Sequence, residues 1–274
     1  MKPADFEFLQ TMLRQRSGLV LTPDKTHLLE SRLTPVARRH GLERLDDLVE
    51  RLRAARTEEL AREVTEAMTT NESSFFRDSK PFDSFRKEIL PALLAARAQR
   101  KQLRIWCAAA STGQEPYTLA MILKEEQAKL AGWRTEIVAT DLSTEVLEKA
   151  KAGIYSQFEV QRGLPVQMLV KYFTQTGEMW QIAAPLRAMV SYRAFNLLGD
   201  PGLLGRFDVV FCRNVLIYFD QPTKAQVLHR IGKQLAPDGY LVLGVAETVL
   251  GVTEAFKPVA GQRGFYGPAK AAAA

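Results

Sequence analysis

A run of small and polar residues, Ala108 to Gly113, lies between two apolar segments and leaves room for a ligand to approach the backbone closely. The preceding segment, Leu103 to Trp106, has the apolar character of a buried strand. The following segment begins a helix, and Pro116 suits its first turn. A strand, a tight loop and a helix direct backbone N–H groups and a positive helix end at whatever binds above the sheet. This pattern favours a nucleotide-like ligand, and an ordinary strand-to-helix crossover explains it equally well.

Polar residues follow two further predicted strands. Asp141 closes the strand 136–140, and Arg213 and Asn214 follow the strand 207–212. In a parallel sheet, ligands collect above the carboxyl ends of the strands, where the strand order reverses. A carboxylate at the end of the second strand can accept hydrogen bonds from both ribose hydroxyls. The alternative for Asp141 is that it only starts the helix predicted at 144–152.

Several kinds of site are not favoured. Gly113 is the single glycine of the first loop, so the dinucleotide fingerprint is absent, and so is a P-loop. The sequence therefore suits a ligand without a diphosphate, such as S-adenosylmethionine. The histidines are scattered and form neither metal-ligand spacing nor a hydrolase triad, so we expect no metal. The two cysteines lack such spacing too, and we expect them to be small buried residues.

The composition bounds the class of protein. The chain has 274 residues, a hydrophobic fraction of 46% and a net charge of +6. That length suits one large domain or two smaller ones, and the charge favours an anionic partner: nucleic acid, an acidic protein face or a lipid surface. No apolar run approaches the roughly 18 residues of a membrane span, and the first residues lack a signal-peptide core. We therefore expect a cytoplasmic protein.

The predicted secondary structure differs between two parts of the chain. Residues 1–68 carry helical periodicity and predict an all-helical domain. From Phe82 onward helices and strands alternate, which predicts an α/β domain with a doubly wound, mostly parallel sheet. Further strands are expected at 240–243 and in a last hairpin at 259–266. We also expect short antiparallel strands at 179–182 and 186–192.

Between the helical part and the α/β part lies a polar stretch, residues 69–82, which we interpret as a linker or a site loop. Asn71, Ser73 and Arg77 are suited to holding a small polar ligand. The expected organisation is a helical domain at 1–68, a linker at 69–88 that contributes to the cofactor site, and an α/β domain at 89–270. A small β-subdomain is expected near 174–193, and residues 271–274 form a tail.

The second predicted helix is basic, with Arg32, Arg38 and Arg39 along it. A solvated face is one explanation of this charge, and a docking surface for an acidic helix is the other.

Six segments, in the same order along the chain, resemble the CheR-type chemotaxis receptor methyltransferases, and the resemblance covers nearly the whole chain. The most specific blocks are Ser111-Thr-Gly-Gln-Glu-Pro-Tyr117 and the stretch from Cys212 to Asp220. The segments are Thr70–Arg77, Trp106–Tyr117, Ala139–Asp141, Arg162–Pro165, Asn196–Leu198 and Phe211–Asp220. The resemblance implies a Rossmann-like, S-adenosylmethionine-dependent protein-glutamate O-methyltransferase. It would methylate glutamate side chains on the cytoplasmic helical bundle of chemoreceptors.

The resemblance also implies roles for single residues. Tyr218 would lie toward the reacting end, with Arg77 as a second orienting group. Two departures, Ser73 for threonine and Ala110 for cysteine, keep the hydroxyl and the small size. The implied cofactor contacts are Asn71, Ser73 and Arg77 in the linker, Glu115 in the first loop, Asp141 at the ribose, Asn196 and Leu197 near the adenine, and Arg213 and Asn214 beside the methionine portion.

Some members of this family dock a hairpin of the β-subdomain on a tethering peptide at the receptor's C-terminus. Here the hairpin at 174–182 is short, so we expect no dependence on a tether. We expect a monomer that neither inserts into a membrane nor binds nucleic acid. Two alternatives remain: a cofactor-binding sensor or scaffold without transfer activity, and a nucleic-acid methyltransferase. The absence of interleaved aromatic and basic residues weighs against the second alternative.

Overall fold

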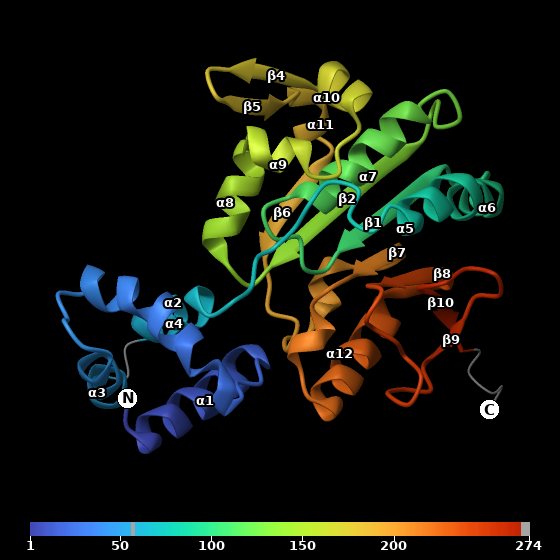
Figure 1. Cartoon of the computed structure of the whole chain (residues 1–274). Coiled ribbons are helices and arrows are strands. Elements are labelled where there is room, and N and C mark those ends of the chain that lie inside the picture. The colour runs from blue at the N-terminus through green and yellow to red at the C-terminus, as the bar shows by residue number, and fades with distance from the viewer. Residues whose placement is uncertain (56–57, 270–274) are drawn as a thin grey trace. The chain divides into compact units, whose positions relative to one another are not determined.

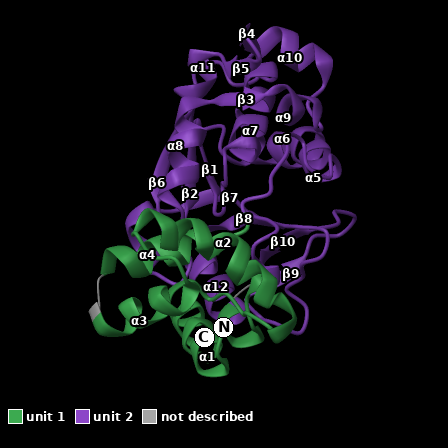
Figure 2. Cartoon of the chain, turned by 60° about the vertical axis from the view of Figure 1, so that its left-hand side comes forward, with its two compact units in different colours: residues 1–70, 218–223 green, residues 71–217, 224–274 purple. Residues whose placement is uncertain are grey.

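The computed structural model describes residues 1–55 and 58–269, and the chain divides into two compact units (Figure 2). The first unit comprises residues 1–70 and 218–223, and the second comprises residues 71–217 and the chain from Lys224 onward. The predicted tail at 271–274 lies outside the described residues, as does residue 270 at the end of the predicted α/β domain. No helix in the described ranges is both long enough and apolar enough to cross a membrane.

The first unit is helical, as predicted (Figure 1). The apolar faces meet in one core that includes Leu9, Leu33 and Val64. Gly18 adopts a φ of +76° and ends the first helix through a hydrogen bond from its N–H to the Arg14 carbonyl. The elements are α1 (Pro3–Ser17), the 3-10 turn η1 (Pro23–Lys25), α2 (Thr26–Arg39), α3 (Leu45–Ala55) and α4 (Glu58–Ala67).

The second unit is built on a seven-stranded sheet with the order β6-β2-β1-β7-β8-β10-β9 (Figure 1). The first five strands in this order are parallel, and β10 and β9 close one edge in antiparallel pairing. This confirms the doubly wound, mostly parallel fold. The strands are β1 (Gln102–Cys107), β2 (Arg134–Asp141), β6 (Val190–Ala194), β7 (Phe207–Cys212), β8 (Leu235–Leu243), β9 (Phe256–Pro258) and β10 (Phe265–Pro268).

The strand order places a switch point between β1 and β7. From β1 the chain moves outward through β2 to β6, and it then returns to the other side of β1 as β7 and β8. The loops after β1 and β7 therefore leave the sheet in opposite directions, which is where open α/β sheets bind ligands. Every residue of β7 is buried, as expected for a strand that is covered on both faces.

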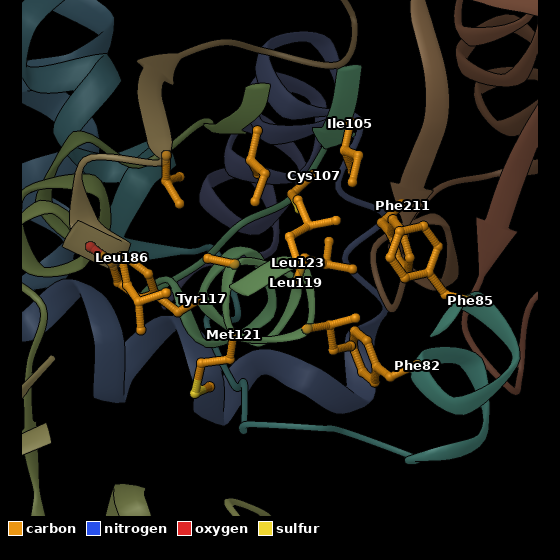
Figure 3. Close-up of a cluster of buried hydrophobic side chains, with 14 of the residues drawn as sticks. Phe82, Phe85, Ile105, Cys107, Tyr117, Leu119, Met121, Leu123, Leu186 and Phe211 are labelled. Atoms are coloured by element: carbon orange, nitrogen blue, oxygen red, sulfur yellow. The ribbon is translucent and has the colours of Figure 1, made fainter. Parts of the chain in front are cut away.

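Helices cover the sheet and complete its core. α7 packs against β2, and α8 packs against β2 and β6. The close-up in Figure 3 shows side chains of α7 gathered with Ile105 of β1, Phe211 of β7, and Phe82 and Phe85. The rings of Phe82 and Phe211 stack with centroids 5.9 Å apart. The elements are α5 (Lys80–Ser84), a π-helical turn (Phe85–Ile89), α6 (Leu90–Ala96), α7 (Gln114–Glu125), α8 (Thr144–Ala152) and α12 (Gln221–Gln234).

A separate antiparallel sheet has the order β3-β5-β4. The expected antiparallel strand at 186–192 is wrong. Leu186 and Arg187 end the short helix α11, a turn follows, and residues from Val190 onward belong to β6, which runs parallel to β2 in the main sheet. Pro185 fits the first turn of α11 and separates the two sheets. The elements are β3 (Ile154–Ser156), α9 (Gln157–Gln161), α10 (Val166–Tyr172), β4 (Phe173–Thr176), β5 (Met179–Ile182) and α11 (Ala184–Arg187).

The last hairpin also differs in position from the expectation. Its strands are β9 and β10, so most of the segment expected to hold it, 259–266, is the connection between them. Two 3-10 turns complete the fold, η3 (Pro201–Leu204) and η4 (Leu216–Tyr218).

Candidate functional site

The loop after β1 spans the ends of both neighbouring strands. The N–H of Ala108 donates to the Phe211 carbonyl of β7 at 2.8 Å, and the N–H of Ala110 donates to the Thr140 carbonyl of β2 at 2.9 Å. The loop is therefore held at the switch point, as the sequence predicts for Ala108 to Gly113. Small side chains allow this path, because the backbone lies directly over the strand ends.

Asp141 fixes the same loop from the end of β2. One carboxylate oxygen accepts the N–H of Ser111 at 2.8 Å, and the other accepts the N–H of Ser143, which precedes α8, at 3.0 Å. Ser111 has a φ of +49°, an uncommon value for a residue with a side chain. Asp141 thus holds Ser143, the N-cap residue of α8, as well as the strained loop. Its hydrogen bonds to a ribose stay a prediction.

Gly113 ends the loop with a φ of +95°, and only glycine fits there. An added Cβ would lie about 3 Å from the Tyr155 and Tyr192 hydroxyl oxygens and from the Ala150 Cβ. The Tyr155 hydroxyl donates to the Thr112 carbonyl at 2.8 Å. Burial raises the pKa of Tyr155 well above its ordinary value, so the hydroxyl keeps its proton for this bond. Sequence reasoning missed Tyr155, which lies outside the loops at the strand ends.

Arg213 connects the loop after β7 to the polar stretch at 71–79. Its side chain is 2% exposed, and its Nη1 donates to Glu115 Oε2 at 2.9 Å. Its Nη2 donates to the Arg77 carbonyl and to Asp78 Oδ2, both at 2.9 Å. The guanidinium carbon lies 5.2 Å from the centre of the Phe82 ring. The structure therefore brings Arg213, Glu115 and the backbone of Arg77 together.

Burial and charge act in opposite directions on the ionised groups of this cluster. Burial raises the pKa of Glu115, and the charge of Arg213 opposes that rise. Among the described residues, the buried Nε of Arg213 has no hydrogen-bond acceptor. A buried N–H donor without an acceptor costs free energy, so this edge of the guanidinium would gain from an acceptor on a ligand.

The polar stretch itself has an unusual backbone. Phe76, Asp78 and Ser79 have φ values of +50°, +65° and +35°, in a region that side-chain-bearing residues rarely adopt. The Phe76 N–H donates to Thr118 Oγ1 of α7 at 3.1 Å. Strained backbone that is held by several contacts is common at ligand sites.

The predicted site residues of this stretch lie at its surface or half-buried. Ser73 and Asn71 are half-buried, and the Asn71 carbonyl accepts a hydrogen bond from Ser111 Oγ at 2.8 Å. The Arg77 Nη1 donates to the Glu72 carbonyl at 2.9 Å. The hydrogen bond from Ser111 joins Asn71 to the loop after β1.

The end of β6 brings the adenine-side candidates to the same edge of the sheet. The N–H of Phe195 donates to the Asp141 carbonyl at 2.9 Å, so the chain leaving β6 is joined to the end of β2. Asn196 follows and is half-buried, and its Oδ1 accepts the N–H of Leu198 at 3.0 Å. Leu197 is buried.

Asn214 follows Arg213 with a φ of +58°, and the carboxylate of Glu247 accepts its N–H at 2.8 Å. Sequence reasoning missed Glu247. One signal points to it: the residue comes shortly after the end of β8, which is another parallel strand of the same sheet.

Tyr218 lies in η4 and groups with the first unit. It is half-buried, and its carbonyl accepts the N–H of Val20 at 3.0 Å. Its place relative to the reacting groups stays a prediction.

The basic residues of α2 differ in their surroundings. Arg32 donates to the carbonyls of Met68 and Thr69, at 2.8 and 3.2 Å, and so caps the C-terminal end of α4. Arg39 pairs with Glu63, with Nη2 and Oε1 2.6 Å apart. Arg38 is exposed, and no ion pair of Arg38 is found within the described residues.

A metal site is not apparent in this part of the molecule. Within residues 1–55 and 58–269, no group of three histidine, cysteine, aspartate or glutamate side chains is placed to hold a metal ion.

Comparison with protein families gives two matches that together span most of the chain. The SAM-binding domain of CheR methyltransferases matches residues 71–265, and the all-alpha domain of CheR methyltransferases matches residues 4–69.

Individual relatives match along nearly their whole length. Chemotaxis protein methyltransferase 1 of Pseudomonas aeruginosa is 42% identical over 260 residues, which are 93% of this chain and 94% of that protein. Chemotaxis protein methyltransferase Cher2 of Pseudomonas putida is 39% identical over 259 residues, again 93% and 94%. The chemotaxis protein methyltransferase of Escherichia coli is 36% identical over 251 residues, 89% of this chain and 84% of that protein.

Proposed function

The chain belongs to the CheR methyltransferase family, and we propose that it methylates glutamate side chains of chemotaxis receptors. The product would be a glutamate methyl ester. The SAM-binding domain of the family spans residues 71–265, so S-adenosylmethionine is the cofactor and S-adenosylhomocysteine its product. The enzyme is accordingly a SAM-dependent methyltransferase of chemotaxis.

The observation that carries the proposal is the arrangement at the switch point. Four neighbouring parallel strands end beside polar residues that the structure joins through hydrogen bonds. The loop after β1 lacks the glycines of a diphosphate-binding loop, and a carboxylate ends β2. This chemistry fits a nucleoside without a diphosphate, which S-adenosylmethionine is.

We assign each part of the site to a part of the cofactor. Asp141 would accept hydrogen bonds from the ribose, and Asn196 with Leu197 would contact the adenine. Glu115, Arg213 and Asn214 would shape the end that holds the methionine portion.

The linker completes the proposed site. Residues 69–88 would contribute Asn71, Ser73 and Arg77 to the cofactor. In support, the structure joins this stretch to the loop after β1 through Ser111 and to the loop after β7 through Arg213.

The proposed reaction needs little acid–base catalysis from the protein. Bound S-adenosylmethionine supplies a methyl group on a sulfonium that is already activated. A glutamate side chain is ionised near neutral pH, so its carboxylate attacks without a general base. The protein's task is to hold the two reactants in line and exclude water. We assign Tyr218 and Arg77 to orienting the groups near the reacting centre.

The proposed partner is the cytoplasmic helical bundle of chemoreceptors, which this enzyme would meet as a cytoplasmic monomer. We propose α2 as the docking face for an acidic receptor helix, with Arg32, Arg38 and Arg39 as its cations. Arg38 is the most direct candidate, since Arg32 caps α4 and Arg39 pairs with Glu63.

We further propose that methylation does not depend on a tether at the receptor's C-terminus. The hairpin of β4 and β5 has four residues in each strand, joined by Gly177 and Glu178. Calorimetry with C-terminal receptor peptides tests this, and we expect no binding at micromolar concentration. Micromolar affinity would overturn the proposal.

The central test is transfer of labelled methyl from S-adenosylmethionine to receptor-rich membranes. We expect label in receptor glutamates, mapped by mass spectrometry, and release of that label as methanol in mild alkali, because an ester hydrolyses there. Cofactor binding without transfer to any receptor would favour the sensor or scaffold. Label in DNA or RNA, with binding that falls steeply with salt, would favour a nucleic-acid methyltransferase.

A further inference from the structure

One carboxylate, that of Glu247, accepts four backbone hydrogen bonds. Oε2 accepts the N–H groups of Asn214 and Gly244, both at 2.8 Å. Oε1 accepts those of Val215 at 2.9 Å and Leu216 at 2.7 Å. Glu247 is 9% exposed, so these bonds form largely out of water. Charged acceptors in such surroundings form the stronger class of hydrogen bond.

Three of the four donors belong to the loop after β7 and define its shape, and the fourth, Gly244, directly follows β8. Three consecutive N–H groups, from Asn214 to Leu216, converge on one side, which requires the left-handed φ of +58° at Asn214. Without an anion these aligned donors would repel one another. Gly244 makes the close approach possible, because an added Cβ would lie 2.7 Å from Glu247 Oε2 and 3.0 Å from the Asn214 nitrogen.

The loop that Glu247 shapes begins next to Arg213, which contacts Glu115 and Asp78. The loop after β8, which carries Glu247, is thus joined through consecutive contacts to the start of α7 and to the polar stretch at 71–79. A series of contacts therefore links Glu247 to both of these elements.

We propose that Glu247 is a positioning residue for cofactor binding, acting through the backbone of Asn214. This inference rests on the proposed function, since it takes Asn214 as part of the S-adenosylmethionine site. Glu247 holds the loop in the left-handed conformation that presents Asn214 to the cofactor, and it does not contact the cofactor itself.

Two substitutions separate the effect of the Glu247 charge from the effect of its side-chain length. Glu247→Gln keeps the length but replaces one oxygen by an NH2 group, which would face two N–H donors. We expect the dissociation constant for S-adenosylhomocysteine to rise roughly tenfold or more, as expected for lost hydrogen bonds to a charged group. Glu247→Asp keeps both oxygens on a shorter side chain, and we expect an affinity between those of Glu247→Gln and the wild type.

The measurement is calorimetric binding of S-adenosylhomocysteine to the full chain, with circular dichroism confirming that each variant is folded. Glu254→Gln is the matched control, because Glu254 is exposed farther along the same loop. Its affinity should equal that of the wild type. If Glu247→Gln fails to fold, Glu247→Asp supplies the decisive affinity, and a wild-type value there would overturn the proposal.

A double-mutant cycle distinguishes positioning from general stabilisation. If Glu247 acts through Asn214, Glu247→Gln will weaken binding much less in an Asn214→Ala background than in the wild type. Additive effects, or a wild-type affinity for Glu247→Gln, would overturn the inference. No receptor is present in this assay. A wild-type protein that binds the cofactor but methylates no receptor would therefore refute the proposed function and leave this inference standing.

Discussion

At the scale of single residues, the carboxylates around the switch point each have a partner inside the protein. Asp141 accepts N–H groups from Ser111 and Ser143, and Glu115 accepts from Arg213. A substitution at either carboxylate therefore changes the shape of a loop as well as any contact with a ligand. Controls must remove a similar internal hydrogen bond elsewhere.

For Asp141→Ala we expect the affinity for S-adenosylmethionine to fall about tenfold or more, because the proposed ribose acceptor and the acceptor of the Ser111 N–H are both lost. Calorimetry measures it. Asp200→Ala is a matched control, since the Asp200 carboxylate also accepts a backbone N–H, from Gly202 at 2.9 Å. An unchanged affinity for Asp141→Ala would remove Asp141 from the site.

Tyr218→Phe removes a single hydroxyl. We expect kcat to fall several-fold or more, with a much smaller change in cofactor affinity, because an orienting group near the reacting centre acts on the transition state. Methyl transfer and calorimetry on the same preparation separate the two quantities. Tyr240→Phe, in β8, controls for loss of a tyrosine hydroxyl. Wild-type turnover would count against the assignment of Tyr218.

Residue types and spacing indicated Asp141 and the loop at 108–113, because a carboxylate and small residues at strand ends carry a local signal. They did not indicate Glu247 or Tyr155. Glu247 contacts Asn214 across 33 positions of sequence, and Tyr155 contacts Thr112 across 43. Such partners become neighbours only once the strand order is fixed.

At the scale of elements, a buried ionic cluster joins the helix before β1 to the strand β7. The Nε of Arg97 donates to Asp208 Oδ1 at 2.5 Å, and its Nη2 lies 2.7 Å from Asp238 Oδ1. The side chains of Arg97 and Asp208 are only 3% and 4% exposed. The Arg104 N–H also donates to Asp208, at 2.8 Å, so the cluster includes the backbone of β1.

Arg97→Met should destabilise the second unit by about 3–5 kcal/mol, because it leaves the buried Asp208 carboxylate short of a partner. Urea unfolding followed by circular dichroism measures the loss. Arg100→Met is the matched control: Arg100 contacts the same carboxylate, but its side chain is 53% exposed, and we expect a loss of about 1 kcal/mol or less. Equal losses would show that burial does not set the strength of these pairs.

We expect charge reversal on the basic face of α2 to change receptor recognition and not cofactor binding. Arg38→Glu should raise KM for the receptor and leave cofactor affinity unchanged, because Arg38 is exposed and its charge is available to an acidic helix. Arg39→Glu added to it should deepen the effect, although it also breaks the pair with Glu63. Lys87→Glu, an exposed cation of the second unit, is the control. An unchanged KM would mean that the face is only solvated.

Element types were more predictable than their pairing. The strand expected at 207–212 is β7, and the helix expected at 144–152 is α8, because both carry a strong local pattern. The segment expected as an antiparallel strand at 186–192 instead ends α11 and begins β6 of the main sheet. Short apolar runs near Pro185 do not specify their partner, and its choice depends on the edge that β2 leaves open.

At the scale of the whole molecule, alternating helix and strand was enough to predict the class of sheet, since right-handed crossovers restrict the possible topologies. The ion pairs of the folded chain could not be predicted from the sequence, because their partners meet only in the fold. Several carboxylates have acquired cationic partners, such as Glu136 with Arg104, whose Oε2 and Nε are 2.7 Å apart. These pairs make stability depend on pH in a direction that can be worked out.

The hydrogen bond from Arg104 lowers the pKa of Glu136 below its ordinary 4.5. Lys171, with Tyr172, lowers the pKa of Glu125, and Lys129, with Arg86, lowers that of Glu126. For a lowered pKa the unfolded chain binds more protons below about pH 4.5, so the free energy of unfolding falls as the pH drops through that region. Glu115 acts in the opposite direction, because burial raises its pKa.

We therefore expect the urea midpoint to hold nearly constant from about pH 8 to 6 and to fall below about pH 4.5, since the lowered carboxyls outnumber Glu115. Glu136→Gln isolates one of them. It should lower the midpoint at pH 7, where the pair with Arg104 is formed, and converge with the wild type at pH 3, where protonation has already broken that pair. Glu178→Gln, at the exposed turn between β4 and β5, should follow the wild type at every pH. A Glu136→Gln curve that runs parallel to the wild type down to pH 3 would show that this ion pair adds nothing to the acid sensitivity of the fold.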